Sequence, residues 1–270
     1  MNILHINKNY SNSRIHHNIA AEMNKKPGVR GRIFYPTYKK SREAYNIEFL
    51  DFIKCLHGYE KVLFAARNRH LLKIAEKTYN IKEFDAILAH SLFSNGYLAM
   101  CLGKKYGISY SVIITNTDMN VYFAKMPHLR NRGLKILSNA HKIIFSSIAY
   151  CEELIDKYVP EELKDTIRKK SAAIPFGIDN FWIENRKERK EKEPDKNVRL
   201  LYVGKINRNK NLTLTLRACE KLKDKGFYVR YTVVGDVSNS SGYKILDELK
   251  SRDFVHYVPG VPFKDLINYY

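Results

Sequence analysis

The sequence predicts an α/β protein with two Rossmann-like, doubly wound parallel-sheet domains, of which the second is incomplete. Short runs of β-branched and aromatic residues alternate with longer stretches of helical periodicity, which is typical of βαβ units. One highly charged segment interrupts this alternation, after which the pattern restarts. The length of 270 residues fits two domains of about 100 to 200 residues each.

The first half of the chain carries the first series of elements. Its short apolar and β-branched runs are expected to form strands at residues 2–6, 32–35, 85–89, 110–115 and 142–146. A helix is expected at residues 13–25. The spacing of Leu92, Leu98, Ala99 and Leu102 indicates another, which ends near Gly103 or Gly107 because glycine favours helix C-termini.

The domain boundary is expected at residues 184–197, which contain no apolar side chain and must therefore be solvated. This places an N-terminal domain at residues 1–180, a charged linker at 181–197 and a partial C-terminal domain at 198–270. The last contains expected strands at 198–203, 228–234 and 255–258, helices at 211–225 and 242–250, and a helical turn at 263–270.

Three strands make up about half of a six-strand doubly wound domain. In the usual strand order 3-2-1-4-5-6, residues 198–203 would form a central strand that lacks its neighbour and becomes an open edge. We therefore expect the chain to be a C-terminally truncated form or fragment of a longer protein.

The charge balance favours an anionic partner. Lysine and arginine total 47 against 28 acidic residues, a net charge of +19. Residues 25–42 and 119–151 contain basic residues and no acidic one, so an anionic membrane surface, a lipid diphosphate and nucleic acid all fit. Because no nucleic-acid-binding signature accompanies the charge, nucleic acid is not the expected partner.

The expected location is the cytoplasm, with peripheral attachment to the inner face of the cell membrane. The four cysteines have no spacing typical of zinc sites or disulfides, which predicts buried free thiols in a reducing compartment. The N-terminus does not resemble a signal peptide, and no apolar run approaches the ~20 residues of a membrane span.

The most informative segment is Leu-Leu-Tyr-Val-Gly-Lys-Ile-Asn-Arg-Asn-Lys-Asn-Leu at residues 200–212. A buried strand ends at Gly204, a basic loop follows, and a helix begins near Asn211. Free backbone N–H groups and the positive helix end would lie beside Lys205, Arg208 and Lys210, which suits a diphosphate. A solvated basic loop is the other interpretation.

This segment resembles the family-4 retaining glycosyltransferases, glycogen-synthase-like enzymes with the GT-B fold. Their strand ends in Val-Gly-Arg or Val-Gly-Lys, and a lysine follows five residues later. The resemblance implies that Gly204, Lys205 and Lys210 hold the diphosphate of a nucleoside-diphosphate sugar, with no metal or other cofactor. Two later strand ends, at Gly235-Asp236 and at Gly260, are similar to donor-binding segments of the family.

The resemblance extends to the first half of the chain. Residues 173–179 are similar to the family's Ile-Pro-Asn-Gly-Ile-Asp crossing segment, with Phe176 in place of asparagine. Residues 84–91, 95–96 and 116–120 resemble strand ends that face the cleft, which makes His90 and Asp118 candidate catalytic residues. A hydrogen-bonded structural histidine and a capping aspartate are the alternatives. His16 and His17 are adjacent on a helix and are not expected to converge on a metal.

The chain departs from the family in three places. The family's Gly-Ser-Asp or Gly-Thr-Asp turn, often preceded by His or Arg, is here Thr-Asn-Thr-Asp at residues 115–118. Residues 8–14, which follow the first strand, lack the family's glycines. The glutamate pair of the family's sugar site, spaced Glu-x7-Glu, would lie beyond Tyr270, so half of the expected donor pocket is missing.

The sequence thus leads to three functional hypotheses. The first is transfer of a sugar, with retention, to a lipid-linked or surface-polysaccharide acceptor. The second is a non-catalytic, truncated glycosyltransferase-like module that needs a partner subunit. The third is a basic nucleic-acid-binding protein.

Overall fold

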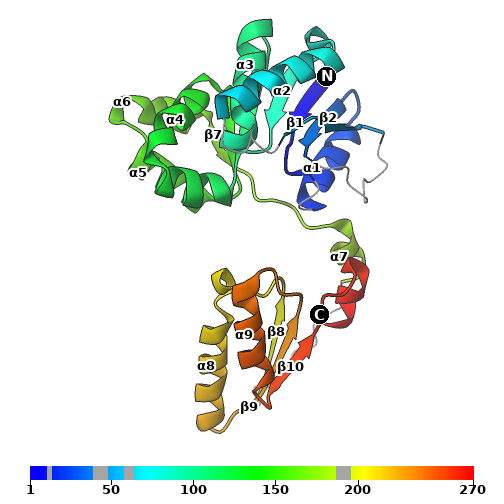
Figure 1. The fold of residues 1–270 in the computed structure, drawn as a ribbon, viewed down its shortest axis with the longest axis vertical. Coiled ribbons are helices and arrows are strands. Elements are labelled where there is room, and N and C mark those ends of the chain that lie inside the picture. Colours follow the sequence, from blue (N-terminus) through cyan, green and yellow to red (C-terminus); the bar gives the residue numbers. More distant parts are fainter. Residues whose placement is uncertain (11–13, 39–47, 58–63, 187–195) are drawn as a thin grey trace. The chain divides into compact units, whose positions relative to one another are not determined.

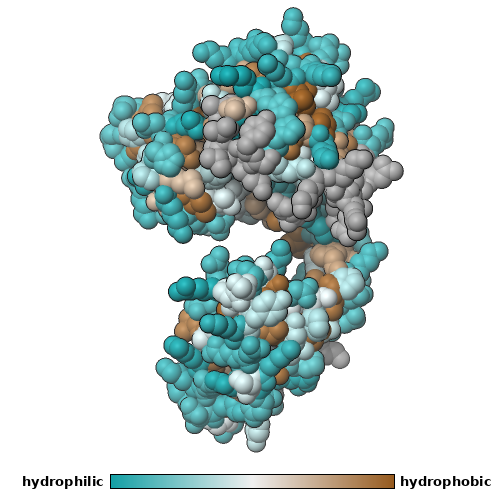
Figure 2. Space-filling view, viewed as in Figure 1, coloured by the Kyte–Doolittle hydropathy of each residue, from teal (hydrophilic) through white to brown (hydrophobic). Residues whose placement is uncertain are grey.

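The computed structural model of the protein describes residues 1–10, 14–38, 48–57, 64–186 and 196–270. They form two compact units, Met1–Gly177 and Ile178–Tyr270 (Figure 1). Parts of three segments discussed above lie outside the described residues: 11–13 of the loop after the first strand, 39–42 of the first basic stretch, and 187–195 of the charged linker. Hydrophilic residues cover most of the visible face of both units, in keeping with a charged fraction of 28% (Figure 2).

Unit 1 contains a parallel sheet with the strand order β3-β2-β1-β4-β5-β6-β7, which confirms the doubly wound α/β prediction. Its strands are β1 (Asn2–Ile6), β2 (Arg30–Thr37), β3 (Leu50–Lys54), β4 (Ala86–Ala89), β5 (Ser109–Ile114), β6 (Lys142–Phe145) and β7 (Ser171–Ala173). Neither β3 nor β7 was expected from the sequence. Because the strands are parallel, their C-terminal ends meet at one edge of the sheet.

The helices of unit 1 are α1 (Arg14–Asn24), α2 (Phe64–Thr78), α3 (Tyr97–Tyr106), α4 (Arg130–Asn139), α5 (Ile148–Tyr158) and α6 (Glu161–Lys170). The helix expected from Leu92 onward begins with a wide π-helical turn at Leu92–Gly96, which continues into α3. It ends at Gly107, whose φ of 71° is the left-handed conformation that glycine adopts readily. No helix among the described residues has both the length and the apolar character needed to cross a membrane.

The core of unit 1 explains why its central strands are almost continuously apolar. Strands β1, β4 and β5 are buried along most of their length, as expected for a parallel sheet covered on both faces. Beside them, the Phe93 ring stacks on Tyr122, with ring centroids 4.6 Å apart, and meets Phe123 edge to face at 5.3 Å. Gly133 of α4 packs against these rings: a Cβ at this position would lie 2.7 Å from Phe93 Cζ and 3.0 Å from Phe123 Cζ.

Unit 2 contains the parallel sheet β10-β9-β8, in the order expected for the first three strands of a doubly wound domain. Its elements are α7 (Asn180–Glu184), β8 (Asn197–Val203), α8 (Leu212–Asp224), β9 (Tyr228–Val234), α9 (Ser240–Lys250), β10 (Val255–Val258) and a 3-10 helix at Phe263–Asn268. Strand β8 lies at the edge, where Leu201 is 37% exposed.

The beginning and the end of unit 2 are held together by aromatic contacts. Asp179 caps α7 by accepting a hydrogen bond from the Phe181 amide, and Trp182 of this helix meets the rings of Phe263 and Tyr270 at centroid distances of 5.5 and 4.9 Å. Residues 181–184, expected to begin the charged linker, are therefore helical, and Phe181 and Trp182 pack against the end of the unit. Of the four cysteines, only Cys219 is buried, so the expectation of four buried thiols was wrong.

The Gly133 contacts give a stability prediction. Gly133→Ala will lower the free energy of unfolding of unit 1 by about 1–3 kcal/mol, because the new methyl group overpacks two buried rings, although alanine favours helix by about 1 kcal/mol. Circular dichroism during urea unfolding measures the loss. The exposed Asn131→Ala on the same helix is the control, and equal stability of the two variants would contradict the prediction.

Candidate functional site

The three strands of unit 2 each end close to a glycine: Gly204 follows β8, Gly235 follows β9 and Gly260 lies two residues after β10. All three were singled out in the sequence, and the parallel sheet brings them to one edge. The Gly204 amide donates to Val234 O at 2.9 Å, and the Gly235 amide donates to Val258 O at 3.0 Å. Main-chain hydrogen bonds thus tie the three strand ends together beyond the strands themselves.

Gly235 lies too close to the carbonyl group of Gly204 to carry a side chain. The φ angles of Gly204 and Gly235 are 155° and 149°, which disfavour residues with a Cβ. A Cβ on Gly235 would lie 1.9 Å from Gly204 O, which no local adjustment could relieve. The site therefore has an edge made of bare backbone.

At Gly260, the missing side chain leaves room for a carboxylate instead of for main chain. The Gly260 amide donates to Asp236 Oδ1 at 2.9 Å, and a Cβ here would lie 2.2 Å from Asp236 Oδ2. The absence of a side chain lets the exposed Asp236 carboxylate rest against the main chain after β10. Asp236 thus presents an oriented carboxylate at the same edge.

The basic loop after Gly204 is fixed through its backbone, while its charges stay in solvent. Ile206 is fully buried and its amide donates to Asp236 O at 2.9 Å, and the Tyr202 hydroxyl donates to Lys205 O at 2.9 Å. Lys205 and Lys210 are exposed, and within the described part of the chain neither makes an ion pair. Their ammonium groups are therefore available to an anion.

Helix α8 begins beside this loop without a capping side chain. Asn211 precedes it with φ of 52°, the sole positive φ of a non-glycine residue in the described ranges, and its side chain makes no capping hydrogen bond. By contrast, Asn239 caps α9 by accepting from the Gly242 amide at 3.2 Å. The uncapped amides of α8 and the positive end of its dipole suit an anion.

The equivalent edge of unit 1 holds a cluster of three histidines. His5 lies on β1, His90 follows β4 and His16 lies on α1. His5 Nδ1 and His90 Nε2 are 3.0 Å apart in a hydrogen bond, and the His16 ring meets the His90 ring edge to face at 5.5 Å. His90 is only 1% exposed, so direct contact with a ligand would require the groups that cover it to move.

Burial disfavours the charged forms of these histidines. It lowers the pKa of His5 to about 4 and lowers the pKa of His16. The pKa of His90 falls well below its usual value, first through burial and then through its two histidine neighbours. In the ranges described, no three or more His, Cys, Asp or Glu side chains, these histidines included, are arranged so that they could hold a metal ion. His16 and His17 face different partners, since His17 Nδ1 bonds the Tyr10 hydroxyl at 2.9 Å.

Asp118, the other candidate catalytic residue, is buried and fully engaged. Its carboxylate accepts hydrogen bonds from the amides of Leu92 and Phe93, at 3.2 and 3.1 Å, and from the Thr115 amide and hydroxyl, at 2.9 and 2.7 Å. Burial raises the pKa of Asp118, although these hydrogen bonds act to lower it. Its contacts are those of a residue that holds the loop after β5 against the helical turn after β4.

The structure therefore brings together four of the residues predicted from the sequence, Gly204, Gly235, Asp236 and Gly260, and places Lys205 and Lys210 on the adjoining loop. His90 and Asp118 are linked through the segment between β4 and α3, and their catalytic role stays a prediction. Sequence reasoning missed His5. A polar residue inside the apolar run Ile-Leu-His-Ile was the signal that could have identified it.

A protein family model matches part of this chain, and solved structures share its fold. Residues 184–270 match the family model described as Glycosyl transferases group 1. The chain has no significant match among curated proteins.

Solved structures resemble the chain over almost its whole length. The lipopolysaccharide outer core galactosyltransferase WaaB is 14% identical, with a TM-score of 0.66 over 98% of this chain and 70% of that one. Starch synthase IV of Arabidopsis thaliana, bound to ADP and acarbose, is 11% identical, with a TM-score of 0.60 over 99% and 76%. The UDP-GlcNAc 2-epimerase of Neisseria meningitidis, bound to UDP-GlcNAc, is 14% identical, with a TM-score of 0.56 over 99% and 74%. At these identities the likeness establishes the fold, which is GT-B.

The glycine contacts predict two different outcomes for the same substitution. Gly235→Ala will lower the free energy of unfolding of unit 2 by about 3 kcal/mol or more, because the methyl group meets main chain. Gly260→Ala will cost about 1 kcal/mol, because the Asp236 carboxylate can swing into solvent. Fluorescence of Trp182, the single tryptophan, follows unfolding of this unit. Equal losses in the two variants would contradict the assigned contacts.

The histidine cluster predicts a pH dependence for unit 1. Unfolded histidine binds a proton near pH 6.5, whereas folded His5 does so only near pH 4. Stability is therefore full above pH 6.5 and falls as the pH drops toward 4. The side-chain amide of the His5→Asn variant can still donate to His90. Between these pH values, its free energy of unfolding should change less steeply with pH than that of the wild type, by up to about 1.4 kcal/mol per pH unit, which corresponds to one proton. Urea unfolding followed by circular dichroism measures it; an unchanged slope would contradict the prediction.

Proposed function

We propose that this protein transfers a sugar from a nucleoside-diphosphate sugar to an acceptor, and that the edge of unit 2 binds the diphosphate of the donor. The observation that carries the proposal is the combination of bare backbone at Gly204 and Gly235 with the exposed ammonium groups of Lys205 and Lys210, which form no ion pair with the residues that the structure describes. The match of residues 184–270 to a glycosyltransferase family model supports it. Two solved structures of the same fold are complexes with ADP and with UDP-GlcNAc, which also supports a nucleotide ligand.

The proposed chemistry is stabilisation of the leaving group. When the bond between the anomeric carbon and the diphosphate oxygen breaks, negative charge grows on the diphosphate. Fixed positive groups that face this charge lower the barrier, because they need no rearrangement at the moment of reaction. In this proposal Lys205, Lys210 and the first amides of α8 supply the positive groups, and no metal ion takes part.

The proposal also covers the stereochemistry, the acceptor and the location of the reaction. We infer transfer with retention at the anomeric carbon, to a lipid-linked or surface-polysaccharide acceptor, at the inner face of the cell membrane. The structural likeness to WaaB, a galactosyltransferase of the lipopolysaccharide outer core, supports an acceptor of this kind. The acid-free basic stretch at residues 119–151 suits an anionic membrane surface or a lipid diphosphate.

A second candidate function is epimerisation of a nucleotide sugar. It is favoured by structural likeness to several UDP-GlcNAc 2-epimerases, among them that of Neisseria meningitidis. Incubation with UDP-GlcNAc followed by NMR of the sugar distinguishes the two candidates. A new nucleotide-linked epimer would favour epimerisation, whereas release of UDP in the presence of an acceptor would favour transfer.

The diphosphate assignment predicts the effect of removing single charges. Lys205→Ala and Lys210→Ala will each weaken the binding of UDP or ADP by about tenfold, the effect of one lost charge-assisted contact. Calorimetry on the whole chain measures this. Lys225→Ala, an exposed position at the opposite end of α8, removes the same charge and should leave affinity unchanged.

Equal affinity in the wild type and both loop variants would remove the assignment. Absence of binding by any nucleoside diphosphate would instead favour the non-catalytic module. Gel filtration then tests whether the chain associates with a partner. Retention on single-stranded or duplex nucleic acid that falls steeply with salt would favour the nucleic-acid hypothesis.

A further inference from the structure

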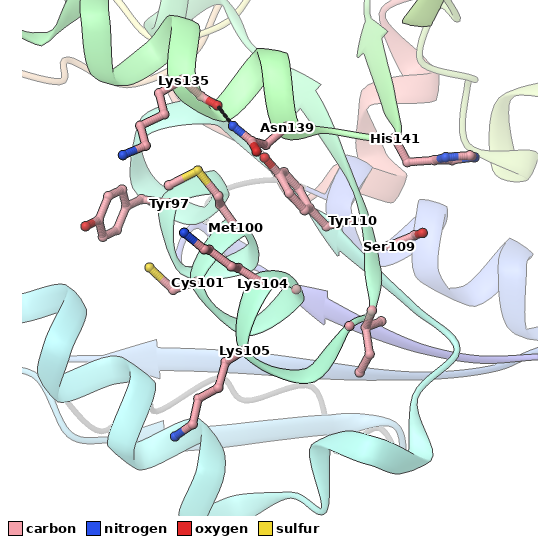
Figure 3. Close-up of a pocket in the computed structure, with 13 residues that line it drawn as sticks. Tyr97, Met100, Cys101, Lys104, Lys105, Ser109, Tyr110, Lys135, Asn139 and His141 are labelled. Carbon is pink, nitrogen blue, oxygen red and sulfur yellow. Dashed lines mark hydrogen bonds between the residues drawn. The ribbon is translucent and has the colours of Figure 1, made fainter.

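Unit 1 has a pocket that the proposed function does not use. It lies between α3, α4 and the beginning of β5, and has a volume of about 880 Å³ (Figure 3). None of the residues proposed for the donor or for catalysis lines it. The pocket is therefore a candidate binding site for a second ligand.

The charges around this pocket are all of one sign. Three lysines line it, Lys104, Lys105 and Lys135, and no acidic residue does. The charge of Lys105 is compensated, because its Nζ lies 2.6 Å from Glu76 Oε1. Lys104 and Lys135 are exposed and form no ion pair within the described ranges. Two uncompensated positive charges remain.

The side chains of these two lysines lie on the same side of the pocket. Figure 3 shows the Lys104 and Lys135 side chains extending to the side of the pocket where Tyr97 and Cys101 lie. Burial raises the pKa of the Cys101 thiol, while Tyr97, Lys135 and Lys104 act to lower it. Both lysines therefore favour the same negatively charged form of the thiol.

Part of the remaining lining is apolar, and Ser109 and Asn139 add polar groups. Met100 and Tyr110 are 8% and 4% exposed, and Ile108 and the Tyr97 ring add to the same wall. The volume lies within the range of about 300–1,000 Å³ that is typical of sites for small organic ligands. A bare inorganic anion would leave the apolar wall uncovered.

We propose that this pocket binds a soluble phosphomonoester, with its phosphate between Lys104 and Lys135 and its organic part against Tyr97 and Met100. A phosphomonoester carries about −1.5 to −2 charges near neutral pH, which matches two ammonium groups, whereas a carboxylate matches only one. Lysine binds phosphate as a point charge and needs no fixed planar geometry, so two flexible side chains suffice.

The thiol in the pocket offers a direct test that does not depend on catalysis. Phenyl phosphate is added to the whole chain, and the rate of alkylation of each cysteine is followed by peptide mass spectrometry. Alkylation of Cys101 should slow as phenyl phosphate saturates the pocket. Cys55 and Cys151, which are also partly exposed, should react at unchanged rates. Undiminished alkylation of Cys101 at all concentrations would overturn the proposal.

Two comparison ligands separate the parts of the interaction. Phenyl glucoside, which has the ring without the charge, should not protect Cys101. Inorganic phosphate should protect only at higher concentration, because it lacks the contact with the apolar wall. Equal protection by phenyl phosphate and phenyl glucoside would contradict the phosphate assignment.

Charge-removing variants localise the phosphate. Lys104→Met and Lys135→Met keep most of the side-chain volume and should each raise the half-protecting concentration of phenyl phosphate about tenfold. Lys26→Met, an exposed position that does not line the pocket, removes the same charge and should have no effect. An equal change in all three variants would show that only net charge matters and would overturn the site.

A lipid headgroup could supply the same chemistry, and vesicles distinguish this source. Vesicles that contain phosphatidic acid, whose headgroup is a phosphomonoester, should leave Cys101 alkylation as unchanged as phosphatidylcholine vesicles do if the ligand is soluble. Protection by phosphatidic acid vesicles without protection by phenyl phosphate would overturn the proposal in favour of a membrane surface.

Discussion

The candidate site of unit 2 depends on one backbone contact, between Gly235 and the carbonyl oxygen of Gly204. A Cβ there would lie 1.9 Å from that oxygen. This approach allows the loop after β8 to bond the strand end after β9, and so holds the buried Ile206 and the backbone of Lys205 in place. The charges can then remain solvated, because the main chain and not the side chains fixes the loop.

The two units use the C-terminal edges of their sheets differently. In unit 2 this edge combines glycines with exposed charges. In unit 1 it is filled: His5 and His90 bond each other, and the Asp118 carboxylate is occupied by backbone amides and by Thr115. Unit 1 therefore has its polar groups organised beneath the surface, where they shape the loops that a ligand would meet.

The sequence was sufficient to predict features that depend on local pattern. The apolar strands and the glycines after β8 and β9 were identified correctly, because a parallel sheet imposes alternation on the chain and close backbone approach excludes side chains. The α2 helix was missed because it carries Arg67, Asn68 and His70 among its apolar residues. The β3 strand was missed because two of its five residues, Asp51 and Lys54, are charged. The His5–His90 bond and the Lys104–Lys135 pair join residues that are distant in the chain, and no local pattern reveals such pairs.

Because the loop lysines are exposed, they affect mainly how fast a ligand binds, whereas the backbone amides affect mainly how long it stays bound. Attraction by exposed charges extends over about 10 Å in 0.1 M salt and shrinks as salt is added. Hydrogen bonds from backbone amides act only on contact and respond little to ionic strength. In the proposed site, Lys205 and Lys210 would therefore govern mainly how often a nucleotide arrives, and the amides near Gly204 and α8 how long it stays.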